Sequence, residues 1–220
     1  MEMPMISLVG EIFVRRDGLS RQYITEHLAE KGFATVCAPV SEWMNYADWL
    51  VDTGINNGKR TLKEKVGIKL KRRATAKFDR LINAALARSG LLLSRPADVP
   101  SIIGKAEPYI SPSHCGEAIL TVGSAISEIV NHACGVIAIG PFGCMPNRMS
   151  EAILSETMTR DVKLASDPGN RQLKEILAEI QDLPFLAIES DGSPFPQLIN
   201  AKLEAFCLRA ERLHRKMVQF

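Results

Sequence analysis

Residues 135–154 read GVIAIGPFGCMPNRMSEAIL, and this stretch decides how the chain folds. It begins with an apolar run without alternation, which is typical of a strand buried on both faces of a parallel sheet. A Gly/Pro turn at 141–144 separates the run from a helical pattern over 147–158. A buried strand that turns directly into a helix is part of a βαβ unit and predicts an α/β fold.

Three further apolar runs share this character, MISLVG at 5–10, FATVCA at 33–38 and PFLAIE at 184–189. Strands that alternate with helices predict a Rossmann-like three-layer α/β sandwich with a parallel sheet of about four strands, each buried on both faces. In the first predicted helix, Ser20 is the expected N-cap and Gly32 the expected C-terminal stop. The helical patterns cover 19–32, 116–135, 147–158, 170–182 and the stretch from Pro196 to about Met217.

The spacing of these runs divides the chain into three segments. Residues 1–40 hold the first part of the α/β domain, 111–220 hold its second half, and 41–110 form a mostly helical insertion. Within the insertion, 59–80 carries ten Lys/Arg and two acidic residues, in a chain whose formal net charge is +2. Such a basic run is either a solvated helix face or an anion site.

Composition excludes several classes of protein. No apolar run reaches the roughly 18–20 residues of a membrane span, and the N-terminal MEMPMISLVG lacks the basic start of a signal peptide. We therefore expect a cytoplasmic protein without a membrane partner. Only Phe78 interrupts the basic run as an aromatic residue, which argues against a nucleic-acid partner.

Known nucleotide and zinc motifs are also absent from the sequence. Neither GxGxxG after a strand nor GxxxxGK[ST] occurs, so no nicotinamide site and no P-loop nucleotide site are expected. The four histidines show no zinc-ligand spacing. Any ligand site must therefore be sought among other polar residues.

The five cysteines lie far apart without a CxxC pair, which argues against a disulfide framework. Ligands of a parallel sheet gather at the carboxyl ends of its strands, where Cys37, Cys115 and Cys144 are expected. Cys115 and Cys144 each precede a helix, whose free N–H groups and macrodipole stabilise a thiolate. Each can equally be a small residue that fits a tight turn. Cys134 and Cys207 are expected to be structural.

Acidic side chains are expected at the same edge of the sheet. Glu11 follows the first strand, Glu117 opens the helix after Cys115, and Asp191 follows the fourth strand. With the cysteines they form the expected ligand site. A thiolate there could be an iron–sulfur ligand or a nucleophile.

Similarity to a known family extends over four stretches, GEIFVRRDGLSRQYITEHLAEKGFATVCAPVSEWMNY, HCGEAILTVGSAI, GVIAIGPFGCMPNRMSEAIL and PFLAIESDGSPFPQLINAKLEAFCLRAERLH. Together they resemble the 2-hydroxyacyl-CoA dehydratase component family. The closest branch is the C-terminal region of the CoA-substrate-specific enzyme activase-related (2-hydroxyglutaryl-CoA dehydratase-like) proteins. The specific part is GPFGCMP together with the SDGSPFPQ block, and the basic segment is not covered.

The resemblance implies one Rossmann-like half of a two-domain subunit, in which three cysteine thiolates hold a [4Fe–4S] cluster between the domains. The cluster of that family takes an electron from an ATP-driven activator and dehydrates a 2-hydroxyacyl-CoA by radical chemistry. Cys144 matches the family's ligand after the third strand, and Cys115 and Cys37 are further candidates. The family's N-terminal α/β domain and an activator-type ATPase domain are missing from this sequence. A companion α/β domain or subunit is therefore expected to complete the site.

Two other functions stay open from the residues alone. One is a non-catalytic binding domain that uses 59–80 for CoA phosphates or an acidic partner. The other is an acyltransferase or hydrolase with Cys115 or Cys144 as its nucleophile.

Overall fold

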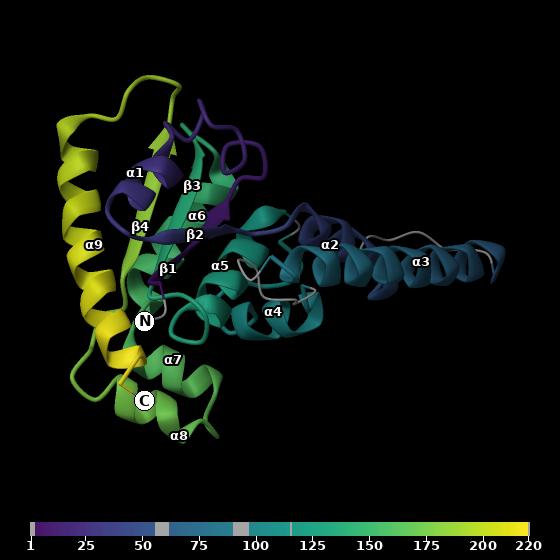
Figure 1. Cartoon of the computed structure of the whole chain (residues 1–220). Coiled ribbons are helices and arrows are strands. Elements are labelled where there is room, and N and C mark those ends of the chain that lie inside the picture. Colours follow the sequence, from purple (N-terminus) through teal and green to yellow (C-terminus); the bar gives the residue numbers. More distant parts are fainter. Residues whose placement is uncertain (1–2, 56–61, 90–96, 115, 220) are drawn as a thin grey trace. The chain divides into compact units, whose positions relative to one another are not determined.

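The structure of the chain, a computed structural model, describes residues 3–55, 62–89, 97–114 and 116–219 (Figure 1). It divides into two compact units, of which the first comprises Met1–Ala38 and Ile102–Phe220 and the second Pro39–Ser101. The sequence segments had boundaries after residues 40 and 110. In the structure the first unit takes in 102–110 as well.

A parallel sheet of four strands forms the centre of the first unit, in the order β2-β1-β3-β4. The predicted α/β fold with a parallel sheet is thus confirmed. Because β1 lies beside β3, the direction of winding changes between these two strands, and their carboxyl ends form the topological switch point. The strands are β1 (Met5–Gly10), β2 (Ala34–Cys37), β3 (Gly135–Pro141) and β4 (Phe185–Ser190).

Burial follows the position of each strand in the sheet. The central strands β1 and β3 are buried along almost their whole length, as their unbroken apolar runs predict. The edge strand β2 is half-buried throughout, and β4 alternates between half-buried and buried residues. The prediction that all four strands are buried on both faces is wrong for β2 and β4, because an edge strand has a neighbour on one side only.

Helices cover both faces of the sheet (Figure 1). On one face α1 packs against β2, and α9 packs against β3 and β4. On the other face α5 packs against β1 and β3, and α6 packs against β3 and β4. Apolar side chains of α5 are buried as the predicted stripe requires. These helices are α1 (Ile24–Glu30), α5 (Glu117–Glu128), α6 (Met145–Thr157) and α9 (Gln197–Met217).

Three of the predicted helices differ markedly in range from the observed ones. The helix predicted at 116–135 ends at Glu128. The other two are the first helix and the helix predicted at 170–182. The first begins at Ile24, because residues 12–23 form turns in which Asp17 accepts the Ser20 backbone N–H at 2.7 Å. Ser20 is therefore not the N-cap, whereas Gly32, with a φ of +84°, ends the helix as predicted. The helix predicted at 170–182 ends at Ile176. It is preceded by a short helix that was not predicted, so this region holds α7 (Arg160–Ser166) and α8 (Arg171–Ile176).

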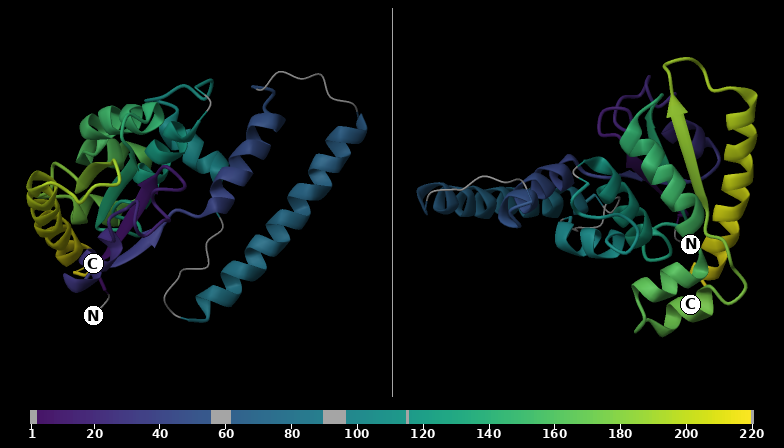
Figure 2. Two further views of the ribbon diagram at one scale, coloured as in Figure 1. Left: turned by 90° about the horizontal axis from the view of Figure 1, so that it is seen from above. Right: turned by 180° about the vertical axis from the view of Figure 1, so that it is seen from behind.

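The second unit is helical in its described residues. α2 (Val40–Asp52) and α3 (Leu62–Ala87) pack side by side (Figure 2), and α4 (Val99–Ala106) begins in this unit. Lys71 Nζ of α3 lies 3.5 Å from Asp48 Oδ1 of α2. These helices correspond to the predicted helical insertion. Among the described residues, no helix combines the length and apolar composition that a membrane crossing requires.

Candidate functional site

The carboxyl ends of β1 and β3 form the centre of the candidate site. Gly10 ends β1 with a φ of +107°, and a Cβ at this position would lie 2.1 Å from the carbonyl oxygen of Ile139. The next residue, Glu11, donates its backbone N–H to the same oxygen at 2.9 Å. Only glycine permits this close approach, which holds the chain after β1 against the end of β3.

Side chains of the loop at 11–23 stabilise its start. The Glu11 carboxylate accepts the backbone N–H groups of Phe13 and Val14, at 3.1 and 2.8 Å. Arg15, which is 6% exposed, donates from its guanidinium to the carbonyl oxygen of Gly10. Glu11 thus lies at the predicted edge, but its carboxylate is already engaged by the loop backbone.

The same loop also reaches the end of β4. Ser190 Oγ donates to the carbonyl oxygen of Ser20, and Gln22 Nε2 donates to that of Gly192 at 3.3 Å. The loop therefore joins the ends of β1 and β4, which lie on either side of β3 in the sheet. It borders the place where β3 turns into α6.

Cys144 occupies the N-cap position of α6, with an extended backbone. Its N–H donates to the carbonyl oxygen of Pro141 at 3.1 Å, which closes the turn after β3. The thiol is free and half-buried. The first N–H groups of a helix have no intrahelical partner, but the Cys144 side chain makes no capping hydrogen bond to them. The structure thus places Cys144 at the strand-to-helix turn where the sequence predicted it.

An ion pair fixes the start of α6 to the end of β4. Arg148 Nε lies 2.5 Å from Glu189 Oε1, and Arg148 also contacts Glu151 at 3.2 Å. Neither Arg148 nor Glu189 was predicted as a site residue, because the two partners are far apart in the chain. The pair holds the turn that presents Cys144.

Asn147 is a second residue that the sequence did not single out. It lies in the first turn of α6, is 4% exposed, and packs so closely on β3 that a Cβ at Gly140 would lie 2.6 Å from its Cγ. Neither polar atom of its amide has a hydrogen-bond partner among the described residues. A buried unpaired polar group costs about 1–3 kcal/mol, which ordered water or a ligand can offset.

Glu117 opens α5 at the same edge of the sheet. Burial raises the pKa of its carboxyl group, and the negative charge of Glu11 raises it further. Arg15 and a hydrogen bond from the Ile12 backbone oppose this rise. Glu11, Arg15 and Glu117 are therefore close enough to influence one another, as the topological rule predicted for the two acids.

Glu117→Gln is expected to stabilise the first unit more at pH 7 than at pH 4. A carboxyl whose native pKa is raised binds more protons in the native than in the unfolded state, so its contribution to stability falls as pH rises above 4.5. Glutamine keeps the carbonyl acceptor and removes the charge. Urea unfolding at pH 4 and pH 7 measures the effect, and a gain that is equal at both values would contradict it.

The remaining predicted site residues lie in less reactive settings. Cys37 Sγ donates to the carbonyl oxygen of Arg15 at 3.5 Å, and burial raises the pKa of its thiol. Asp191 is exposed and accepts the Ser193 backbone N–H at 2.8 Å, as a turn residue does. Cys115 lies outside the described residues.

The two cysteines expected to be structural are buried in the first unit. Burial raises the pKa of the Cys134 thiol to about 12 and also raises that of Cys207. Thiols in such surroundings are inert. Of the described cysteines, Cys144 is the one that lies at a strand-to-helix turn of the predicted edge.

The described residues do not by themselves fit a [4Fe–4S] cluster. Such a cluster is normally held by four cysteine thiolates. In the described part of the chain, no group of three or more Cys, His, Asp or Glu side chains could hold a metal ion. β1 separates the strands of Cys37 and Cys144, so these strands are about 10 Å apart.

No protein-family model, curated protein or solved structure matches this chain. The resemblance to dehydratase components therefore stays a prediction. The function has to be inferred from the carboxyl edge of the sheet.

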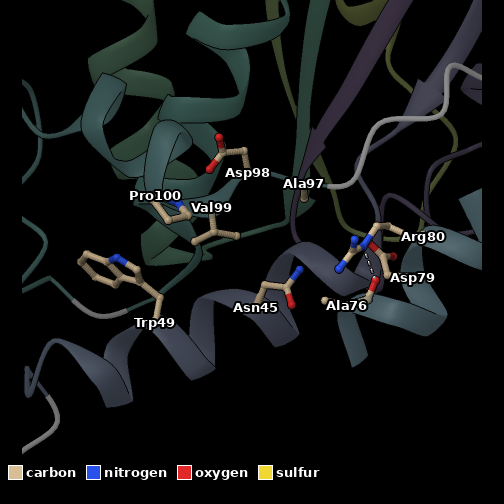
Figure 3. Close-up of a pocket in the computed structure, with 9 residues that line it drawn as sticks. All are labelled: Asn45, Trp49, Ala76, Asp79, Arg80, Ala97, Asp98, Val99 and Pro100. Carbon is tan, nitrogen blue, oxygen red and sulfur yellow. Dashed lines mark hydrogen bonds between the residues drawn. The ribbon is translucent and has the colours of Figure 1, made fainter. Parts of the chain in front are cut away.

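A separate pocket of about 210 Å³ lies within the second unit (Figure 3). Arg80 Nε donates to the carbonyl oxygen of Ala76 at 3.1 Å, and the Asp98 carboxylate accepts the Ser101 N–H. Two carboxylates and one guanidinium line the pocket, a balance that does not favour CoA phosphates. Residues 59–61 of the basic segment lie outside the described residues. The lining consists of Asn45, Trp49, Ala76, Asp79, Arg80, Ala97, Asp98, Val99 and Pro100.

Proposed function

We propose that the chain is a thiolate-bearing domain related to 2-hydroxyacyl-CoA dehydratase components. In this proposal Cys144 supplies one ligand to a [4Fe–4S] cluster that is shared with a companion α/β domain or subunit. The observation that carries it is the position of Cys144, a free thiol at the N-cap of α6 beside the topological switch point. A bound cluster would supply one-electron chemistry there.

Sharing of the cluster accounts for the small number of described ligands. Cys144 can supply one thiolate, and Cys115 remains a candidate for a second. The other ligands would come from the companion. An ATP-driven activator and an acyl-CoA substrate are the further partners that the resemblance implies, and they belong to this proposal.

Exposed apolar side chains around the edge support a docking companion. Phe142 and Met145 flank Cys144 and are 73% and 69% exposed. Phe13 and Leu19 of the neighbouring loop are each 63% exposed. Large exposed apolar patches mark interaction sites, and a docked companion would also exclude water from Cys144.

In this proposal the chain's own residues position the thiolate and shape its surroundings. Gly10 holds the chain after β1 against the end of β3, and the pair Arg148–Glu189 fixes the start of α6. Among the described residues, the Asn147 amide has no hydrogen-bond partner, and Glu117 adds a carboxyl group of raised pKa to the same edge.

Cys144→Ser is expected to lower the iron and sulfide content of the chain at least about tenfold when the tagged protein is purified anaerobically with its partners. The reason is the loss of a thiolate ligand at a position that tolerates a small polar side chain. The measurement is iron and acid-labile sulfide per chain, together with the visible absorption of the complex.

The matched control is Cys207→Ser, which changes a buried cysteine of α9 and should leave the iron content unchanged. Recovery of the same partners with both variants would show that assembly is intact. A wild-type complex without iron and sulfide, or a Cys144→Ser complex that retains both, would contradict the proposal.

A further inference from the structure

α3 of the second unit presents an apolar face to solvent. Six of its large apolar side chains are exposed, with exposed fractions from 48% for Leu86 to 67% for Leu70, whereas Ile68 is half-buried. Successive members are spaced mostly three or four residues apart, so they follow one side of the helix, with the small residues Ala74 and Ala85 between them. These side chains are Val66, Leu70, Phe78, Leu81, Ile82 and Leu86.

The partly buried side of α3 is the more polar one. Three of the five residues described as half-buried there are polar, Thr75, Asp79 and Asn83, and the other two are Ile68 and Ala87. Asp79 lines the pocket beside α2. An ordinary surface helix buries its apolar stripe and exposes its polar side. The reversed pattern of α3 indicates that the exposed face has an occupant of its own.

Positive charge borders the apolar face. Arg73, Lys77 and Arg80 are exposed, and helical spacing places them along one flank of the apolar side chains. The one described acidic side chain of α3, Asp79, lies on the opposite, partly buried side. An occupant of this face must therefore accept apolar side chains and carry negative charge.

We propose that α3 is an interfacial helix that binds anionic phospholipid surfaces with its axis parallel to the membrane. Such helices have Lys/Arg on the polar face, Leu and Phe on the other, and lengths of about 20–30 residues. α3 has 26 residues, a length of roughly 39 Å. Its apolar side chains would enter the headgroup region, and its cations would contact lipid phosphates.

The alternative occupants fit less well. Two copies of α3 packed antiparallel would bring Arg73 and Lys77 of each copy close to the same residues of the other, and like charges disfavour that contact. A protein partner would need an acidic groove of matching shape, whereas a flat bilayer surface matches a line of side chains on one straight helix. An interfacial helix lacks the continuous apolar run of a spanning segment, so the sequence predicted no membrane partner.

Flotation of the full chain with vesicles tests the proposal. The probes are vesicles of phosphatidylcholine with about 30% phosphatidylserine, and vesicles of phosphatidylcholine alone. Wild type is expected to bind the anionic vesicles at least about tenfold more tightly, with binding that weakens as salt is raised. The triple variant Leu70→Ser, Phe78→Ser and Ile82→Ser is expected to reduce binding at least about tenfold.

Charge and control variants complete the test. Arg73→Glu with Lys77→Glu should weaken binding to anionic vesicles at least about tenfold and reduce its salt dependence. The matched control, Leu198→Ser with Leu208→Ser, changes two similarly exposed leucines of α9 and should bind like wild type. Circular dichroism of each variant checks that the helices remain folded.

Three results would overturn the proposal. The first is a wild-type chain that does not bind anionic vesicles. If that chain instead sediments as a dimer and the triple variant as a monomer, the apolar face is a dimer interface and the proposal is wrong. The second is a folded triple variant that still binds like wild type. The third is a charge variant whose affinity for anionic vesicles is unchanged.

Discussion

Gly10→Ala is expected to lower the free energy of unfolding of the first unit by about 3–5 kcal/mol. Two costs add at this position. The backbone has a φ of +107°, which strains any residue with a Cβ, and the new Cβ would lie 2.1 Å from the Ile139 carbonyl oxygen. That oxygen belongs to the central strand and accepts the Glu11 N–H, so it cannot move without loss of this bond. Urea unfolding followed by circular dichroism measures the effect.

Gly32→Ala separates the two costs. Gly32 also has a positive φ, +84°, but a Cβ there would meet no atom within 4 Å. Its replacement should cost only about 1–2 kcal/mol, the price of the left-handed backbone alone. Equal losses of stability in the two variants would contradict a steric cost from the Ile139 carbonyl oxygen at Gly10.

The sheet could be predicted because its strands are encoded locally. The four apolar runs are short, rich in β-branched residues and bounded by Gly or Pro, and each became a strand. The loop at 11–23 could not be predicted in the same way. It depends on contacts such as that of Gln22 with Gly192, which lies 170 residues further along the chain and belongs to no local pattern.

The same contrast holds for the candidate site. Cys144, Glu11 and Glu117 could be placed at one edge because the carboxyl ends of parallel strands and the starts of the following helices meet there. The burial of the Asn147 amide and the ion pair of Arg148 with Glu189 depend on how α6 packs on β3 and β4. No local sequence pattern predicts that packing. The exposed apolar face of α3 could not be predicted for another reason. Helical periodicity in the sequence does not show which side of a helix packs against the rest of the protein.

Lys163→Met is expected to remove a pH dependence of stability that the wild-type chain shows above pH 7. Lys163, in α7, is 1% exposed, and its Nζ donates to the carbonyl oxygens of Ile126 and Ser127 at 2.8 and 3.3 Å. Burial lowers the pKa of its amine to about 7, and the charge of Lys105 contributes. Lys163 thus satisfies the C-terminal carbonyl groups of α5 while it is close to losing its proton at neutral pH.

The direction of the effect follows from proton binding. In the unfolded chain the amine keeps its ordinary pKa of 10.5, so between pH 7 and 10.5 the unfolded state binds more protons than the native state. The free energy of unfolding then rises with pH, by up to about 1.4 kcal/mol per pH unit. Methionine has no titrating proton. The free energy of unfolding of wild type minus that of Lys163→Met should therefore increase by about 2 kcal/mol from pH 7 to pH 9. Lys174→Met, at an exposed lysine of α8, should show no such growth. A difference that stays constant over this range would mean that Lys163 keeps its charge inside the fold.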